Sequence, residues 1–388
     1  MGKLKHEAIR VSSQEEPLVA SLRLIRSRRV GATTFHRMVA EHGSAAAALD
    51  ALPSVARAAG VNDYAPFSEA AARAELDAGL ALGARPLFFG GADYPQALID
   101  LSDAPPFLWA KGRLDLLDRP MVALVGARNA SSLGTRMARR LAEDLGAQGH
   151  VIVSGLARGI DRVAHMAALD TGTVAVQAGG IDIAYPAENA ALTEEIGEKG
   201  LRLTEQPPGL TPQARHFPQR NRIIAGLARA VVVVEAAARS GSLITARTAL
   251  DQGREVLAVP GHPFDARAAG CNMLIRDGAV LVRGADDVIE VLATTCGRPD
   301  RPDLFAEVPT PCAAEVPEAP VQAQRPPPAD ISTLHEEILS RLGPSPLAED
   351  QLIRDLNLPA GRVAPELVML ELDGRIARAP GGLLSRCD

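Results

Sequence analysis

The sequence contains few aromatic residues and almost no lysine. Aromatic residues make up 3% of its 388 positions, and lysine occurs only at positions 3, 5, 111 and 199. Scarce aromatics argue against a long platform on which successive bases of a nucleic acid would stack. Genomic base composition is a sufficient explanation for the preference for arginine. Arginine must still make nearly every basic contact in the central part of the chain, and its planar guanidinium suits paired contacts with phosphate oxygens.

Cysteine pairs, long apolar runs and net positive charge are also absent. The four cysteines are scattered with no C-x-x-C pair, which argues against a zinc site or disulfide framework and favours a reducing compartment. No run approaches the roughly 18 apolar residues that span a bilayer, and the N-terminal segment lacks the apolar core of a secretory signal. We therefore expect a cytoplasmic protein without membrane contact. The net charge of −6 counts mildly against a nucleic-acid ligand.

Composition and pattern divide the chain into four parts. Residues 1–83 are predicted to form small alanine-rich helices, a helical domain weakly similar to a SAM or helix-hairpin-helix element, with a plain helical cap as the alternative. Residues 84–296 form the predicted α/β domain. Residues 297–330 are rich in proline and favour an extended linker. Residues 331–388 are predicted to be a winged helix, with helices at 332–342, 347–356 and 361–373 before a hairpin.

The central part alternates short apolar strands with helices, which is typical of an extended Rossmann-like, doubly wound and mostly parallel sheet. Ligands of such sheets bind beyond the carboxyl ends of the strands, so the loops there carry the candidate residues. Two short strands, PLFF and PFLWAKG, precede the alternating region. The expected strands of that region are 121–126, 150–155, 173–179, 201–205, 230–236, 255–261 and 279–282.

Three of these loops combine glycine, hydroxyl and arginine side chains in the way that phosphate sites do. The first is GARNASSLGTR, where a helix is expected to begin near Leu133; the second is SGLARGID; the third joins FPQRNR to the later segment ARSGSLITA. We expect them to meet at one edge of the sheet. The candidate phosphate-binding residues are Gly126, Arg128, Ser131, Arg158, Gly159, Arg220, Asn221, Arg222, Ser240, Gly241, Ser242 and Thr245.

Asp161 and His165 lie four positions apart and therefore share one helical face. They are either a catalytic acid–base pair or, as we favour, a structural contact that orients the preceding loop. No serine or cysteine nucleophile of recognised context accompanies them, and no Walker, G-x-G-x-x-G or H-E-x-x-H motif occurs at the expected places. We therefore expect no cofactor, no metal and no enzymatic activity.

Taken together, the segments VGARNASSLGTRMARRLA, SGLARGIDRVAHMAAL, FPQRNRIIAGLARAVVVVEAAARSGSLITARTAL and GCNMLIRDGA resemble the DprA/Smf family of DNA-processing proteins over about residues 85–293. The resemblance implies sequence-independent binding of single-stranded DNA and loading of RecA, in place of single-strand-binding protein, during natural transformation. Arg128 and Arg158 fall where the family has basic DNA contacts. The family more often has serine where Ala127 stands and often lysine where Arg158 stands.

The same resemblance implies a homodimer. The family's dimer contact falls on residues 272–281, which makes Ile275 and Leu281 candidates, and a RecA contact is expected nearby, at Arg276 and Asp277. In the winged helix, the third helix GRVAPELVMLELDG lacks the arginine, asparagine and glutamine pattern of base contacts. We expect that helix not to read duplex DNA.

Two other functions fit parts of the pattern. Nucleoside-monophosphate phosphoribohydrolases share this sheet type, but SGSLITA lacks the diglycine and paired glutamate of their phosphate loop. A structural adaptor with vestigial anion pockets is the second alternative. Loss of DNA affinity on substitution of Arg128 and Arg158 distinguishes a DNA-binding protein from the adaptor.

Overall fold

The computed structural model describes residues 16–296 and, with gaps, residues 334–386; the linker expected at 297–330 lies outside the described residues. The chain divides into two compact units, residues 1–304 and residues 305–388, which are taken in turn. No helix in the described residues is long and apolar enough to cross a membrane.

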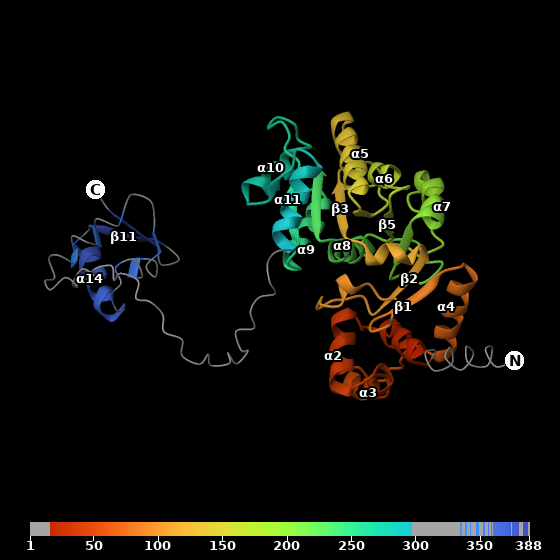
Figure 1. Ribbon diagram of the computed structural model, residues 1–388. Coiled ribbons are helices and arrows are strands. Elements are labelled where there is room, and N and C mark those ends of the chain that lie inside the picture. The colour runs from red at the N-terminus through yellow and green to blue at the C-terminus, as the bar shows by residue number, and fades with distance from the viewer. Residues whose placement is uncertain are drawn as a thin grey trace, which may run out of the picture. The chain divides into compact units, whose positions relative to one another are not determined.

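The first unit is built on a nine-stranded sheet in the order β1-β2-β6-β5-β4-β3-β7-β8-β9 (Figure 1). Strands β3 to β9 pair in parallel, whereas β1 and β2 extend the sheet in antiparallel fashion. The expected doubly wound, mostly parallel sheet is thereby confirmed. Its strands are β1 (Arg85–Phe88), β2 (Phe107–Gly112), β3 (Met121–Gly126), β4 (Val151–Ser154), β5 (Thr173–Val176), β6 (Leu201–Thr204), β7 (Ala230–Glu235), β8 (Glu255–Ala258) and β9 (Val280–Leu281).

Helices connect these strands and cover both faces of the sheet (Figure 1). A first helix spans residues 16–26. The other helices of the unit are α2 (Ala32–His42), α3 (Ala45–Ala58), α4 (Glu69–Ala81), α5 (Ser132–Ala147), α6 (Ile160–Ala167), α7 (Ala190–Lys199), α8 (His216–Leu227), α9 (Ser242–Asp251), α10 (Ala269–Arg276) and α11 (Ala285–Cys296), with short 3-10 turns η1 (Gln96–Leu98), η2 (Leu114–Asp118) and η3 (Ala187–Asn189).

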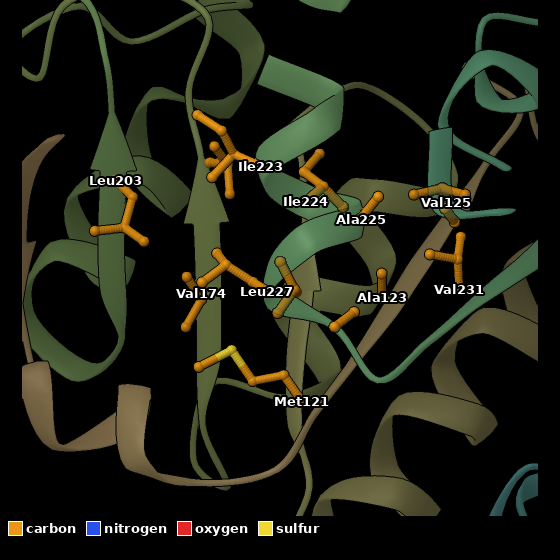
Figure 2. Close-up of a cluster of buried hydrophobic side chains, with 14 of the residues drawn as sticks. Met121, Ala123, Val125, Val174, Leu203, Ile223, Ile224, Ala225, Leu227 and Val231 are labelled. Atoms are coloured by element: carbon orange, nitrogen blue, oxygen red, sulfur yellow. The ribbon is translucent and has the colours of Figure 1, made fainter. Parts of the chain in front are cut away.

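Strand β3 shows why both faces are covered. Successive side chains of a strand point to opposite faces, and Ala123 and Val125 pack with α8 and α9 in one core, while Val122 and Leu124 pack with α5, α6 and α11 in another. Figure 2 shows the first core, where one face of α8 lies over β3 and β5. A strand that is apolar at every position is stable only between two such layers.

The strand order reverses direction between β3 and β7. From β3 the chain proceeds outward through β4, β5 and β6 on one side and through β7, β8 and β9 on the other. Loops that leave neighbouring strands in opposite directions leave a crevice at their carboxyl ends. At this point Gly126 of β3 stands opposite Glu235 of β7, after a break in the register at Val125 and Gly126.

The N-terminal helices pack against the sheet edge formed by β1 and β2 (Figure 1). Trp109 of β2 is fully buried there, lies against Gly79 of α4, and shares a core with Leu22 and Leu76. The division at residue 83 stays a prediction, because residues on both sides of it belong to one compact unit.

A chain of ion pairs and hydrogen bonds joins this edge to α8. Arg222 of α8 donates to Glu205, which follows β6, and also to the Asp103 carbonyl. Arg26 of the first helix donates to the Glu205 carbonyl at 2.9 Å and pairs with Glu75 of α4 at 2.8 Å. Burial raises the pKa of Glu205, and Arg222 acts in the opposite direction. The carboxylate therefore depends on Arg222 for its charge partner.

The second unit has its own small core, which includes Leu342, Leu352, Leu367 and Leu384. Helix α14 (Ala360–Leu372) and the hairpin of β11 (Ile376–Ala379) and β12 (Leu383–Arg386) confirm the expected third helix and hairpin. The expected helix at 347–356 is wrong at its start, because Leu347 pairs with Leu384 and forms strand β10 (Leu347–Ala348). Within the described residues this gives the three-stranded sheet β10-β12-β11.

Replacement of Arg222 by leucine should destabilise the protein by roughly 2–4 kcal/mol, because it leaves the mostly buried Glu205 carboxylate without its partner. Urea unfolding measures the change. Arg140→Leu is the control: Arg140 forms an exposed pair with Asp144 in α5, so its loss should cost less than about 1 kcal/mol. Equal effects of the two substitutions would contradict the role given to Arg222.

Candidate nucleic-acid interface

A cavity of about 790 Å³ opens at the carboxyl ends of β3 and β7, where the strand order reverses. Its walls come from the loops after β3, β4, β7 and β8, from α8 and from the first turn of α9. Four arginines line it, at positions 128, 220, 239 and 267, against a single carboxylate, Asp161. A smaller hollow beside it is lined by Arg158, Tyr185 and Phe217 and shares Arg128 and Arg220 with the main cavity.

The N-terminus of α5 is occupied by a carboxylate of the protein itself, that of Glu235. The Ser131 backbone N–H donates to Glu235 Oε2 at 2.9 Å, and Ser131 Oγ accepts from the Gly134 N–H at 2.9 Å. A Cβ at Gly134 would lie 2.1 Å from Glu235 Oε2, so only glycine admits the carboxylate. Arg267 approaches Glu235 Oε1 at 3.4 Å. The expectation that this helix end is an open phosphate site, with Ser131 as a ligand, therefore needs correction: Ser131 caps the helix and Glu235 occupies it.

The loop after β4 is held by two separate contacts rather than by a bond between Asp161 and His165. Asp161 Oδ2 accepts the Gly155 and Ala157 N–H groups at 3.1 and 3.3 Å. His165 Nε2 accepts the Leu156 N–H at 3.3 Å. Both side chains orient the loop, as expected, but each does so independently. Gly159 then leads into α6, and the Ile160 N–H donates to the Ala127 carbonyl at 3.2 Å, which ties this loop to the first.

The hydrogen bonds of His165 fix a neutral imidazole. Thr173 Oγ1 donates to the Ile152 carbonyl at 2.9 Å and must therefore accept from His165 Nδ1, 2.7 Å away. The proton is thus on Nδ1, while Nε2 accepts from Leu156. Burial, together with the nearby Arg220 charge, lowers the pKa of His165 to about 3. A histidine that stays neutral at physiological pH and whose two nitrogens are engaged serves structure here.

Arg220 lines both the cavity and the hollow. It is 6% exposed, and its Nη1 donates to the Val176 carbonyl at 3.3 Å. A Cβ at Gly155 would lie 1.3 Å from that nitrogen, so glycine is required there. Burial lowers the pKa of Arg220 to about 10, and the Asp161 carboxylate opposes this effect. The guanidinium remains charged at neutral pH.

Phe217, which the sequence analysis did not single out, lies between two arginines. The guanidinium carbons of Arg128 and Arg220 are 5.4 and 5.8 Å from its ring centre, within the range of cation–π contacts. Tyr185 lies 5.8 Å away from it, ring centre to ring centre. A half-buried aromatic ring flanked by guanidinium groups and beside a second aromatic ring offers a local stacking surface for a base.

The start of α9 lines the cavity but not the adjoining hollow. Gly241 caps this helix without a side-chain hydrogen bond, and the Ser240 and Ser242 hydroxyls lie 2.7 Å from each other. Thr245, in the first turn, is 2% exposed and lines the cavity. Asn221 of α8 faces the same space. The cavity thus brings together Gly126, Arg128, Arg220, Asn221, Ser240, Gly241, Ser242 and Thr245 of the predicted set.

Two predicted arginines lie elsewhere. Arg158 lines the hollow, is 58% exposed and approaches Glu188 at 3.6 Å. Arg222 lies outside the cavity, because its guanidinium is directed to Glu205 and Asp103. Its role is structural.

Comparison with known proteins identifies this architecture. The family model for DNA recombination-mediator protein A matches residues 85–293, the DprA-like N-terminal HHH domain matches 15–78, and the DprA winged helix domain matches 322–382. Protein Smf of Escherichia coli is 38% identical over 293 residues, which cover 74% of each chain. This chain belongs to the DprA/Smf family.

Other members agree with this assignment. DNA processing protein DprA of Streptococcus pneumoniae is 49% identical over 198 residues, covering 50% of this chain and 70% of that protein. Its crystal structure superposes with a TM-score of 0.53 at 45% identity, over 55% of this chain and 77% of the other. A structure that describes the single-stranded DNA binding mode of DprA from Helicobacter pylori superposes with a TM-score of 0.51 at 30% identity, over 55% of this chain and 96% of the other.

The cavity also contains residues that sequence reasoning missed. Phe217, Arg239 and Arg267 all line it. In the motif FPQRNR, Phe217 stands three positions before Arg220. Residues at this spacing share one face of a helix, so the motif indicated that Phe217 lies beside Arg220. Among the described residues, no group of three or more histidine, cysteine, aspartate or glutamate side chains is arranged to hold a metal.

We predict that the His165 imidazole does not titrate between pH 8 and pH 5, as followed by nuclear magnetic resonance with His165→Gln as the assignment control. Its folded pKa, about 3, lies below the unfolded value. The stability that depends on a neutral His165 is thus fully present above about pH 6.5 and is lost below it, at about 1.4 kcal/mol per pH unit. A midpoint near pH 6.5 in the folded protein would disprove the fixed neutral form.

Proposed function

We propose that this protein binds single-stranded DNA without sequence preference in the cavity at the β3–β7 reversal and the adjoining hollow. The observation that carries the proposal is the excess of arginine over carboxylate there, at positions 128, 220 and 239, around the half-buried ring of Phe217. Guanidinium groups neutralise phosphates and a partly exposed aromatic ring stacks on any base, so neither element selects a sequence. The single-stranded DNA binding mode described for the Helicobacter pylori relative supports the same ligand.

The protein acts, in this proposal, as a recombination mediator in the cytoplasm that loads RecA onto the strand in place of single-strand-binding protein. Its family description as a DNA recombination-mediator protein supports this role. In this proposal it works without catalysis, because the two acid–base candidates, Asp161 and His165, bond to the backbone and hold the loop after β4. A phosphoribohydrolase would need an acid–base group directed to the ligand.

A homodimer formed through α10 and β9 completes the proposal. β9 is the edge of the sheet and pairs only with β8 among the described strands. Val280 and Leu281 in it are each 40% exposed, and Ile275 of α10 is only partly covered. An exposed apolar edge strand is a ready surface for a second copy. Arg276 and Asp277, next to this edge, are the proposed RecA contact and pair with each other at 3.0 Å.

Arg128→Ala combined with Arg158→Ala should weaken single-stranded DNA binding by roughly 10- to 100-fold, because two charge-assisted phosphate contacts are lost. Fluorescence anisotropy of a labelled oligonucleotide across a salt series measures both the affinity and the slope, which should fall by about 0.7 per contact removed. The wild type should prefer the single strand to a matched duplex.

The control for that experiment removes the same charge elsewhere. Arg140 and Arg283 are exposed arginines that pair with Asp144 in α5 and Asp287 at the start of α11, outside the cavity. Their double alanine variant should retain the wild-type affinity. Equal losses in both double variants would show that bulk charge, rather than this site, determines binding. Absence of single-stranded DNA binding in the wild type would refute the DNA proposal.

Ile275→Glu together with Leu281→Glu should convert the dimer to a monomer, because two charges would be buried against a second copy at the same edge. Light scattering after size-exclusion chromatography gives the mass directly. Exposed Met166→Glu and Leu250→Glu, on helices α6 and α9, provide the matched control. A wild type that is monomeric at all concentrations would refute the dimer.

A further inference from the structure

The cavity has two chemically different groups of lining residues, of which only the first also lines the hollow. One contains the ring of Phe217 with its arginines, which suits a base and its neighbouring phosphates. The other, which we call the α9 end, consists of Asn221, Arg239, Ser242 and Thr245. It contains no aromatic side chain, and the one carboxylate of the cavity, Asp161, bonds instead to the backbone after β4. The α9 end is therefore built for an anion alone.

The Thr245 hydroxyl is the decisive group at the α9 end. It is 2% exposed and lines the cavity, yet within the described part of the chain it makes no hydrogen bond, whereas Thr248 of the same helix donates to the Ile244 carbonyl at 3.0 Å. Thr245 Oγ1 is not among the buried polar atoms that lack a partner in the described residues, so this hydroxyl is open to the cavity and available to a ligand there. Neither the Asn221 amide nor the exposed Arg239 guanidinium has a partner among the described residues.

The α9 end gathers several donors at one wall of the cavity. Thr245, Asn221, Arg239 and the Ser240–Ser242 pair line the same space, next to the N-terminus of a ten-residue helix. A phosphodiester offers two unesterified oxygens and one negative charge. A phosphomonoester offers three such oxygens and up to two charges, and so matches this set of donors and the positive helix end more fully.

We propose that the α9 end binds a phosphomonoester, either the terminal phosphate of a DNA strand or that of a free nucleoside monophosphate. The strand-end form rests on the proposed DNA binding, and the free-nucleotide form does not. Thr245 contacts the phosphate oxygens directly, with Asn221 and Arg239 beside it. The protein then distinguishes a phosphorylated strand end from a hydroxyl end while remaining indifferent to the base sequence.

The test compares internally labelled oligothymidylates that carry a 5′-phosphate, a 3′-phosphate or hydroxyls at both ends, with the full chain and fluorescence anisotropy. One terminal phosphate should tighten binding by roughly tenfold in the wild type. Thr245→Val keeps the volume of the side chain but removes the hydroxyl, and should bring that ratio close to one. Thr248→Val is the matched control on the same helix and should keep the preference.

Competition separates the two sources of phosphate. Thymidine 5′-monophosphate, with thymidine as its control, should displace the phosphorylated strand if free nucleotides occupy the α9 end. A strand-end preference without such competition assigns the site to strand termini. Equal binding of phosphorylated and hydroxyl ends together with no competition, or a preference that survives in Thr245→Val, overturns the proposal.

A titration with the free nucleotide distinguishes a failure of this inference from a failure of the proposed function. If no strand binds at all, the DNA proposal fails, and calorimetric titration with thymidine 5′-monophosphate then tests the α9 end by itself. Heat of binding in the wild type that disappears in Thr245→Val supports the phosphomonoester site. No heat in the wild type refutes it.

Discussion

The carboxylate of Glu235 organises the region on which the proposed function depends. It ends β7, accepts the Ser131 N–H at the start of α5, and pairs with Arg267 of the loop after β8. Three segments that are remote in sequence therefore meet at one side chain beside the cavity. Because this internal anion satisfies the positive end of α5, an incoming phosphate is left to the arginines and to α9.

Helix α8 connects the cavity with the N-terminal helices. Its cavity side carries Phe217 and Arg220, while Arg222 faces the ion pairs that reach Arg26 of the first helix. Its apolar residues fix it to the sheet between these two sides (Figure 2). The N-terminal helices are thus connected through a few polar contacts to the helix that lines the cavity, although the described residues of those helices lie outside the cavity itself.

Much of this arrangement follows from the sequence. The alternation of apolar runs and helices predicted the sheet, and the loops after β3, β4 and β7 do converge. Arg222 was misplaced because three adjacent residues were assigned together, although positions 220 and 222 are about 200° apart around a helix. The contact of Glu235 with α5 was not predictable, because it needs the neighbouring positions of β3 and β7, which the order of strands in the sequence does not contain.

The burial of Trp109 gives the molecule an internal reporter. It is the only tryptophan of the chain, it is fully buried against Gly79, and its indole N–H lies 3.4 Å from Glu75, the partner of Arg26. Intrinsic tryptophan emission therefore arises solely from the seam between the N-terminal helices and the sheet. A red shift of that emission would signal that water has entered this seam, even while the rest of the sheet stays folded.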